Sequence, residues 1–191
     1  MQAVFGNPLA EPGITGVSAG AAVIAAGLIV TGMVGATSWL LPVGAFVGAL
    51  GATAIVQGVG YGRASRSTAS LLLVGMALNS FLGAITAALI ANAPDAENAR
   101  SAMFWLNGDL TGRTMADVWM VVAPLMIGVS GVLFFARELN MLALGEATAQ
   151  SAGVNVRLVS NLVLAFAALA TAAGVAATGI IAFVGLVVPH L

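Results

Sequence analysis

The sequence lacks cysteine and lysine and carries little charge of either sign. Its 191 residues include no Cys, six basic residues that are all Arg, and seven Asp or Glu, so that only 7% are charged. Soluble domains carry about 25% charged residues. The absence of Cys excludes disulfides and thiol chemistry. Without Lys, a phosphate-binding loop of the G-x-x-x-x-G-K-[ST] type is impossible, and the net charge of −1 gives nucleic acid no basic face.

What the chain has instead is five long apolar stretches without a single Asp, Glu, Lys, Arg or His. About 20 apolar residues, each rising 1.5 Å along a helix, match a hydrocarbon core of roughly 30 Å. Helices of a soluble domain do not repeat this pattern, because they need a wet face. The sequence therefore predicts an all-α polytopic transmembrane bundle with five complete spans. These are Ile14–Ala36, Trp39–Tyr61, Thr68–Ala93, Val118–Ala136 and Leu158–Thr178.

The polar residues are confined to the breaks between these stretches, and successive breaks must alternate between the two sides of the membrane. Tyr61–Ser67 and Arg137–Arg157 share one side and carry four Arg, whereas Pro94–Asp117 lies on the other side with two. Arg and Lys are enriched in cytoplasmic loops. We therefore expect residues 137–157 in the cytoplasm and residues 94–117 outside it, in a multi-pass protein of the inner or plasma membrane.

Both ends of the chain carry partial segments. Met1–Pro12 is neither a complete span nor a soluble domain, and Gly179–Leu191 is an apolar segment that stops with the chain. We expect residues 1–191 to be one transmembrane domain and a fragment of a longer protein.

Glycines four residues apart recur in the apolar stretches, at Gly16/Gly20, Gly44/Gly48 and Gly58/Gly62. In lipid, such pairs let two helix backbones approach closely. They predict either tight packing inside one bundle or a seam between two subunits.

The break Arg137–Arg157 is too long for a plain connection between two spans. Within it, Gly145 and Gly153 bracket about two helical turns. Glu146 would lie in the first turn, where its charge suits the helix dipole, and Gly153 can adopt the left-handed conformation that ends a helix. We expect a short cytoplasmic helix there, either a docking surface or an ordinary interfacial helix. The residues that it would present are Ala147, Ala149 and Gln150.

Five stretches, in the same order, resemble the FecCD-type membrane permeases of binding-protein-dependent ABC importers for iron–siderophore, haem and cobalamin. The resemblance covers all 191 residues of this chain. In a family member, which has about ten spans per subunit, these residues correspond to the middle of the sequence. The stretches are Asn7–Pro12 with Gly16–Ala21, Leu71–Asn79, Trp105–Gly108, Leu139–Val156 and Phe183–His190.

The resemblance implies a transport subunit, not an enzyme. It would move an iron–siderophore or a related metal chelate across the bilayer into the cytoplasm, driven by a separate cytoplasmic ABC ATPase that binds the ATP. This chain would itself hold no cofactor and no metal. Its other partners would be an extracytoplasmic substrate-binding protein and a second permease subunit, identical or different.

The resemblance also assigns roles to single residues. Asn7, Leu9, Ser67 and Thr68 would form the gate at the cytoplasmic mouth, which the Asn, Ser and Thr would make polar without fixed charge. Asn79 would line the translocation path, with a hydrogen bond between helices as the alternative. The segment Gly145–Gly153 would be the coupling helix that sits in a groove of the ATPase. Its coupling residues would be Leu144, Gly145, Glu146, Ala149, Gln150 and Gly153.

On the outer side, Arg100 and Arg113 would pair with acids of the binding protein, unless the four nearby acids pair with them locally. Asp109 follows Trp105–Gly108 where the family commonly has Ser, which places an unexpected charge at this surface.

Other functions fit the sequence less well. Gly16–Gly20 matches G-x-S-x-G, but the nucleophile elbow needs a preceding strand and a base within reach. A zinc site needs three or four ligands, and the chain has one His, His190, and no Cys. A self-contained secondary carrier usually keeps an ionisable group inside a span, and the five stretches have none. A third, non-transport interpretation is that the chain is a membrane anchor or an assembly partner.

Overall fold

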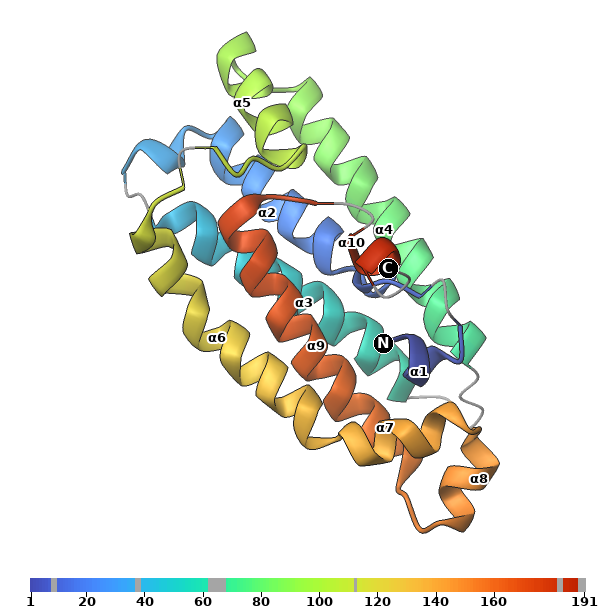
Figure 1. Cartoon of the computed structure of the whole chain (residues 1–191). Helices are drawn as coiled ribbons and strands as arrows, with labels where there is room; N and C mark the ends of the chain where they lie inside the picture. Colours follow the sequence, from blue (N-terminus) through green and yellow to red (C-terminus); the bar gives the residue numbers. More distant parts are fainter. Residues whose placement is uncertain (8–9, 37–38, 62–67, 112, 182–183, 189–191) are drawn as a thin grey trace.

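The computed structural model describes the chain except for residues 8–9, 37–38, 62–67, 112, 182–183 and 189–191, and it shows long helices side by side with short helices between them (Figure 1). The helices are α1 Gln2–Phe5, η1 Pro12–Thr15, α2 Val17–Val30, η2 Met33–Ala36, α3 Leu40–Tyr61, α4 Thr68–Ala91, α5 Ala96–Leu106, α6 Met115–Phe134, α7 Ala136–Ala143, α8 Glu146–Ser151, α9 Val156–Thr178 and α10 Val184–Val187.

Four of the described helices, α3, α4, α6 and α9, are long and apolar enough to cross a membrane. They confirm four of the five predicted spans. Helix α6 begins three residues earlier than predicted because Thr114 and Asp117 form a capping box. The Thr114 backbone N–H and hydroxyl both donate to Asp117 Oδ2, each at 2.8 Å. Such a cap satisfies backbone donors that the first helical turn leaves unpaired.

The first apolar stretch, Ile14–Ala36, differs from the prediction of a complete span. Its regular helix, α2, has only 14 residues. It is interrupted at both ends by glycines with positive φ, Gly16 at 85° and Gly32 at 69°, which flank it with short 3-10 helices. Hydropathy detects apolar residues but not left-handed turns. Among the described residues, four helices are long enough to span a membrane, one fewer than the five complete spans predicted.

Helix α2 packs against α3, α4 and α9 through small side chains. Ala21, Ala25, Ala45 and Ala49 are essentially inaccessible to solvent in this core. At the α2–α3 crossing, a Cβ added to Gly20 would collide with the Gly48 carbonyl oxygen and approach Ala52 Cβ to 2.6 Å. The Gly20 and Gly48 positions therefore pack inside this chain, as one of the two predicted uses of the spaced glycines requires.

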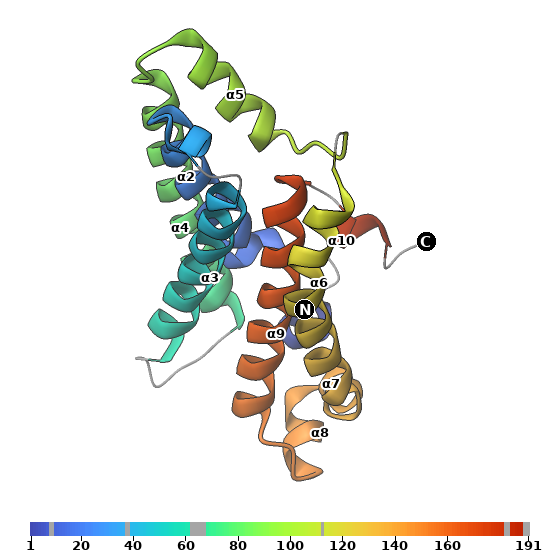
Figure 2. The same ribbon diagram turned by 90° about the vertical axis from the view of Figure 1, so that its left-hand side faces the viewer.

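Three of the short helices, α5, α7 and α8, lie at the ends of the bundle (Figures 1 and 2). Helices α7 and α8 lie at the end where α9 starts, whereas α5 lies at the other end. Helix α5 was not predicted within residues 94–117. It begins at Asp95, whose side chain accepts a hydrogen bond of 2.7 Å from the Asn98 backbone N–H.

Candidate translocation and coupling site

The segment between Gly145 and Gly153 forms the predicted short helix, α8. Gly145 has a φ of 113° and Gly153 a φ of 83°, so both bracketing glycines adopt conformations that other residues rarely take. Glu146 lies in the first turn. One more helix than predicted, α7, occupies the preceding part of this connection.

Helix α8 has one exposed side and one buried side. Leu144 is 70% exposed, and Glu146, Gln150 and Gly153 are also exposed. Ala149 is 0% exposed, so the expectation that it is presented to a partner is wrong. Ala149 lies on the side of α8 that faces the bundle.

The buried side of α8 belongs to an apolar cluster that joins four parts of the chain. It combines α1, the α7–α8 connection and the start of α9, and the first turn of α4 packs against it. We call it the inner-end cluster. Its buried members are Val4, Phe5, Ala10, Leu142, Ala149, Val159, Val163 and Leu164, with Leu71 and Leu72 packed on them.

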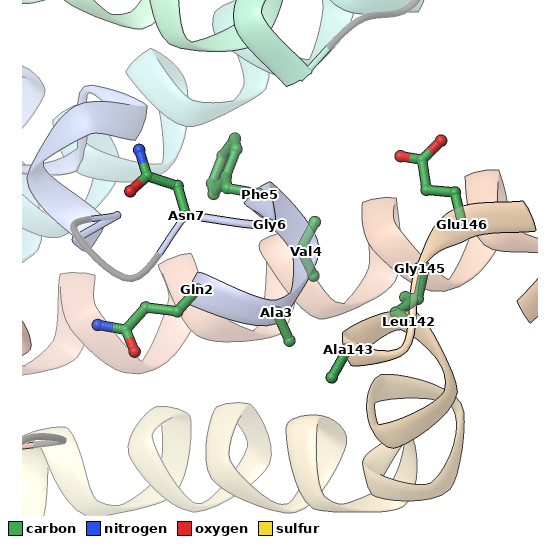
Figure 3. Close-up of a pocket in the computed structure, with 10 residues that line it drawn as sticks. All are labelled: Gln2, Ala3, Val4, Phe5, Gly6, Asn7, Leu142, Ala143, Gly145 and Glu146. Carbon is green, nitrogen blue, oxygen red and sulfur yellow. The ribbon is translucent and has the colours of Figure 1, made fainter. Parts of the chain in front are cut away.

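Asn7 is tied directly to α1. The Asn7 backbone N–H donates to the Gln2 carbonyl oxygen at 3.2 Å, and the Asn7 carbonyl oxygen accepts from the Ala10 backbone N–H at 3.0 Å. Between α1 and the α7–α8 connection lies a cavity of about 590 Å³, with Asn7 on one side and Glu146 on the other (Figure 3). Asn7, predicted for the gate, and Glu146, predicted for coupling, therefore line the same cavity as α1.

The other predicted gate residues fall at the limits of what the structure describes. Leu9 and Ser67 lie outside the described residues. Thr68 is the first residue of α4, and its side chain is not described. Leu71 and Leu72, one turn further along α4, pack on the inner-end cluster. Both predicted gate segments therefore adjoin elements, α1 and α4, that contribute side chains to the same cluster as Ala149 of α8 or pack on it.

Asn79 makes the hydrogen bond between segments that was one of its two predicted uses. Its Nδ2 donates to the Gly13 carbonyl oxygen at 2.9 Å, which links the middle of α4 to η1. Asn79 also lines a cavity of about 480 Å³ together with Glu11, Ser18 and Thr171. The other lining residues of this cavity are mostly apolar, among them Pro12, Val175, Ile180 and Ile181.

Glu11 in this pocket was missed by the sequence reasoning. It lies just before the first apolar stretch, and its only signal was a lone acid next to Pro12 in an apolar neighbourhood. The structure sets it beside the middle of α4. An ionisable side chain, half-buried, therefore borders the bundle although the apolar stretches contain none.

At the opposite end, Arg113 is held locally, because its Nε donates to the Asp109 carbonyl oxygen at 3.1 Å. The pKa of Asp109 lies below its ordinary value, chiefly because its carboxylate accepts from the Thr111 hydroxyl at 2.6 Å and backbone N–H at 2.7 Å, with Arg113 adding a smaller effect. Arg100 is exposed on α5. Docking of a binding protein by these two Arg stays a prediction.

No group of three or more His, Cys, Asp or Glu that could hold a metal ion occurs among the residues that the structure describes.

The four helices long enough to span a membrane and the short segments between them define the class as a polytopic helical membrane protein. The chain belongs to the FecCD transport family, whose model matches residues 1–191. This membership confirms the predicted family and the expectation of a multi-pass membrane protein.

Three relatives illustrate the likeness. Over 190 residues the chain is 40% identical to the cobalamin import system permease protein BtuC of Halobacterium salinarum, covering 100% of this chain and 50% of the relative. It is 37% identical over 204 residues to the hemin transport system permease protein HmuU of Yersinia pestis, covering 100% and 58%. A solved structure described as an inward-facing conformation of a metal-chelate type ABC transporter matches with a TM-score of 0.89 and 28% identity, covering 99% and 59%. The chain therefore spans between half and three fifths of each relative.

Proposed function

We propose that this chain forms the central part of a permease subunit of an ABC importer in the inner or plasma membrane, and that the importer carries a metal chelate into the cytoplasm. The observation that carries the proposal is α8, a short helix between two spans with one side packed on the bundle and the other exposed. The relatives are named for cobalamin and hemin, which supports a metal-bound macrocycle as cargo. An iron–siderophore, which is also a metal chelate, is a further candidate.

The exposed side of α8 fits a contact with a cytoplasmic ATPase. Leu144, 70% exposed, supplies an apolar contact, while Glu146 and Gln150 supply polar ones. Because this chain has no Lys, it has no phosphate-binding loop of its own, and ATP would be bound by that partner.

Through its buried side, a displacement of α8 by the ATPase would be transmitted to the cytoplasmic mouth. Ala149 packs in the same cluster as Phe5 of α1, and α1 is hydrogen-bonded to Asn7. Leu71 connects the cluster to the first turns of α4. Close-packed interiors transmit displacements because they do not compress. A shift of α8 would therefore move both segments assigned to the gate.

The remaining partners follow from exposed surfaces. Helix α4 exposes large apolar side chains, with Leu73 62% and Phe81 63% exposed, and this side suits lipid or a second permease subunit across the path. The end that carries α5 would receive the substrate-binding protein, with Arg100 as an accessible cation. A self-contained carrier is disfavoured, because such a carrier has little use for α8.

The proposal is tested by replacing Gly153 with Ala in the complete permease, reconstituted in liposomes with its ATPase and binding protein. At a φ of 83° an L side chain is strained, so the end of α8 shifts while the spans stay intact. We expect uptake of the radiolabelled chelate to fall to background while the ATPase continues to hydrolyse ATP. Gly51→Ala on α3, where an added Cβ meets no atom within 4 Å, is the matched control and should transport normally. Full uptake by Gly153→Ala would reject the coupling role.

A further inference from the structure

A narrow apolar groove, which we call the α3–α6 groove, runs between these two helices. Both helices pack on α9, which lies between them in Figure 2. Ala173 and Ala176 of α9 close the bottom of the groove, since they are 0% and 4% exposed, and its cavity measures about 210 Å³. None of the residues that line it has a nitrogen or oxygen atom in its side chain. The walls are Pro42 and Phe46 of α3 and Val121 and Pro124 of α6.

The α3–α6 groove lies near one end of all three helices. It takes in residues 42–46 of α3, which begins at Leu40, and residues 120–124 of α6, which begins at Met115. Its two residues on α9 come shortly before that helix ends at Thr178. At a rise of 1.5 Å per residue, the groove extends from about 3 to about 14 Å below these helix ends. This is the end of the bundle that carries α5 (Figure 2).

Tryptophan marks the same end as a membrane interface. All three Trp of the chain lie there, with Trp39 directly before α3, Trp105 in the last turn of α5 and Trp119 in the second turn of α6. Trp39 and Trp119 are 56% and 70% exposed. Exposed Trp of a membrane protein is enriched at the level of the lipid headgroups. Because Trp39 comes three residues before Pro42, and Trp119 one residue before Met120, the groove begins just below that level, at the depth of the acyl chains.

The surface on both sides of the groove suits lipid. Val43 and Val47 of α3 are exposed, as are Met120 and Ile127 of α6. A second helix, about 10–12 Å across, is too wide to enter the groove. Its volume also falls below the roughly 300–1,000 Å³ of most small-molecule pockets. An extended acyl chain is thin enough, and it restores the dispersion contacts that an unfilled gap forfeits.

We propose that the α3–α6 groove binds one acyl chain of a phospholipid from the leaflet at the α5 end of the bundle. The chain lies between Phe46 and Val121, over the two alanines of α9. The glycerol and phosphate groups then lie level with Trp39 and Trp119, whose indole N–H groups donate to ester or phosphate oxygens. The lipid fills the space between α3 and α6 and thereby holds both helices against α9.

The test is photolabelling of the complete permease in liposomes of phosphatidylethanolamine and phosphatidylglycerol. The liposomes contain a trace of phospholipid with a diazirine in the upper half of one acyl chain, and mass spectrometry locates the labelled residues. We expect label on both walls, within residues 42–46 and 120–124. A bound chain stays with the protein, so this label should persist when the permease is extracted into detergent before illumination. Label at Ile127, an ordinary lipid contact that is 57% exposed, should then be lost.

Filling the groove should remove the label. Ala176→Phe fills it from α9 and should lose the label on both walls, whereas Ala88→Phe adds the same side chain at an exposed position of α4 and should keep it. Circular dichroism verifies that the variants are folded. Val121→Phe narrows the groove from its half-buried wall, leaves the bottom unchanged and should lose the label on α3.

Two results would overturn the proposal. One is an unlabelled groove in the unmodified permease, as expected if another helix covers it. The other is undiminished label in the folded Ala176→Phe or Val121→Phe variant. The assay uses neither ATP nor cargo, so its failure would leave the importer function standing, and a failure of coupling would leave the lipid site standing.

Discussion

The α2–α3 crossing makes a quantitative prediction about two glycines of the same helix. A Cβ on Gly48 would collide with the Gly20 carbonyl oxygen and lie 2.7 Å from Ile24 Cγ1. A Cβ on Gly51, three residues further along α3, would meet no atom within 4 Å. Replacing each by Ala adds the same methyl group to the same helix, so the difference between the two variants isolates the close approach of the backbones.

The expected magnitudes follow from two opposing effects. Ala in place of Gly inside a helix gains about 0.5–1 kcal/mol from the lower conformational entropy of the unfolded chain. Gly51→Ala should show this gain alone. Gly48→Ala should also lose about 1–3 kcal/mol, because the helices must separate or distort to admit the methyl group. Gly48→Ala is therefore expected to be about 1–3 kcal/mol less stable than Gly51→Ala.

The assay is reversible unfolding in mixed detergent micelles, followed by circular dichroism. Gly20→Ala should behave like Gly48→Ala, because the Gly20 Cβ would collide with the Gly48 carbonyl oxygen. Equal stability of Gly48→Ala and Gly51→Ala would refute the close α2–α3 crossing.

Two further predictions concern the two ends of the bundle. Phe5→Ala should cost about 3–5 kcal/mol of unfolding free energy and impair uptake, because Phe5 is 6% exposed in the inner-end cluster. The control Phe134→Ala, at a side chain that is 81% exposed, should change the unfolding free energy by about 0.5 kcal/mol or less. Thermal melts of both variants check this difference. Thr111→Val should raise the pKa of Asp109 toward its ordinary value, because the variant lacks the hydroxyl donor, and carboxyl ¹³C NMR titration measures the change. Since folding lowers the pKa of Asp109, its stabilising contribution is complete above the ordinary pKa and is lost as pH falls through the folded-state pKa.

The spans could be predicted from the sequence because an uncharged run of about 20 apolar residues has one stable solution in lipid. The same reasoning failed for α2, where Gly16 and Gly32 adopt positive φ inside an apolar run. Glycine is common in membrane helices, so its presence does not reveal where the chain turns left-handed. Helix α8 could be predicted because two glycines bracket a stretch with a single acid in the first turn.

The candidate site was harder to predict, because its geometry depends on contacts between distant residues. Ala149 was expected to be exposed, but it is buried where α8 packs on α7 and α9, and the local sequence of α8 does not specify these neighbours. Likewise, the position of Glu11 depends on the hydrogen bond that joins Gly13 to Asn79, 66 residues away along the chain. Sequence periodicity reports which side of a helix is apolar, not which neighbour covers it.

The central claim is that α8 lies in the cytoplasm against an ATPase, and cysteine labelling tests it directly. The chain has no Cys, so a single substitution gives an unambiguous signal. Gln150→Cys places the thiol on the exposed side of α8, and Thr111→Cys places one at the opposite end. A membrane-impermeant maleimide should label Gln150→Cys only in inside-out vesicles and Thr111→Cys only in intact cells, and a thiol crosslinker at position 150 should capture the ATPase. Labelling of Gln150→Cys from outside intact cells would contradict the account.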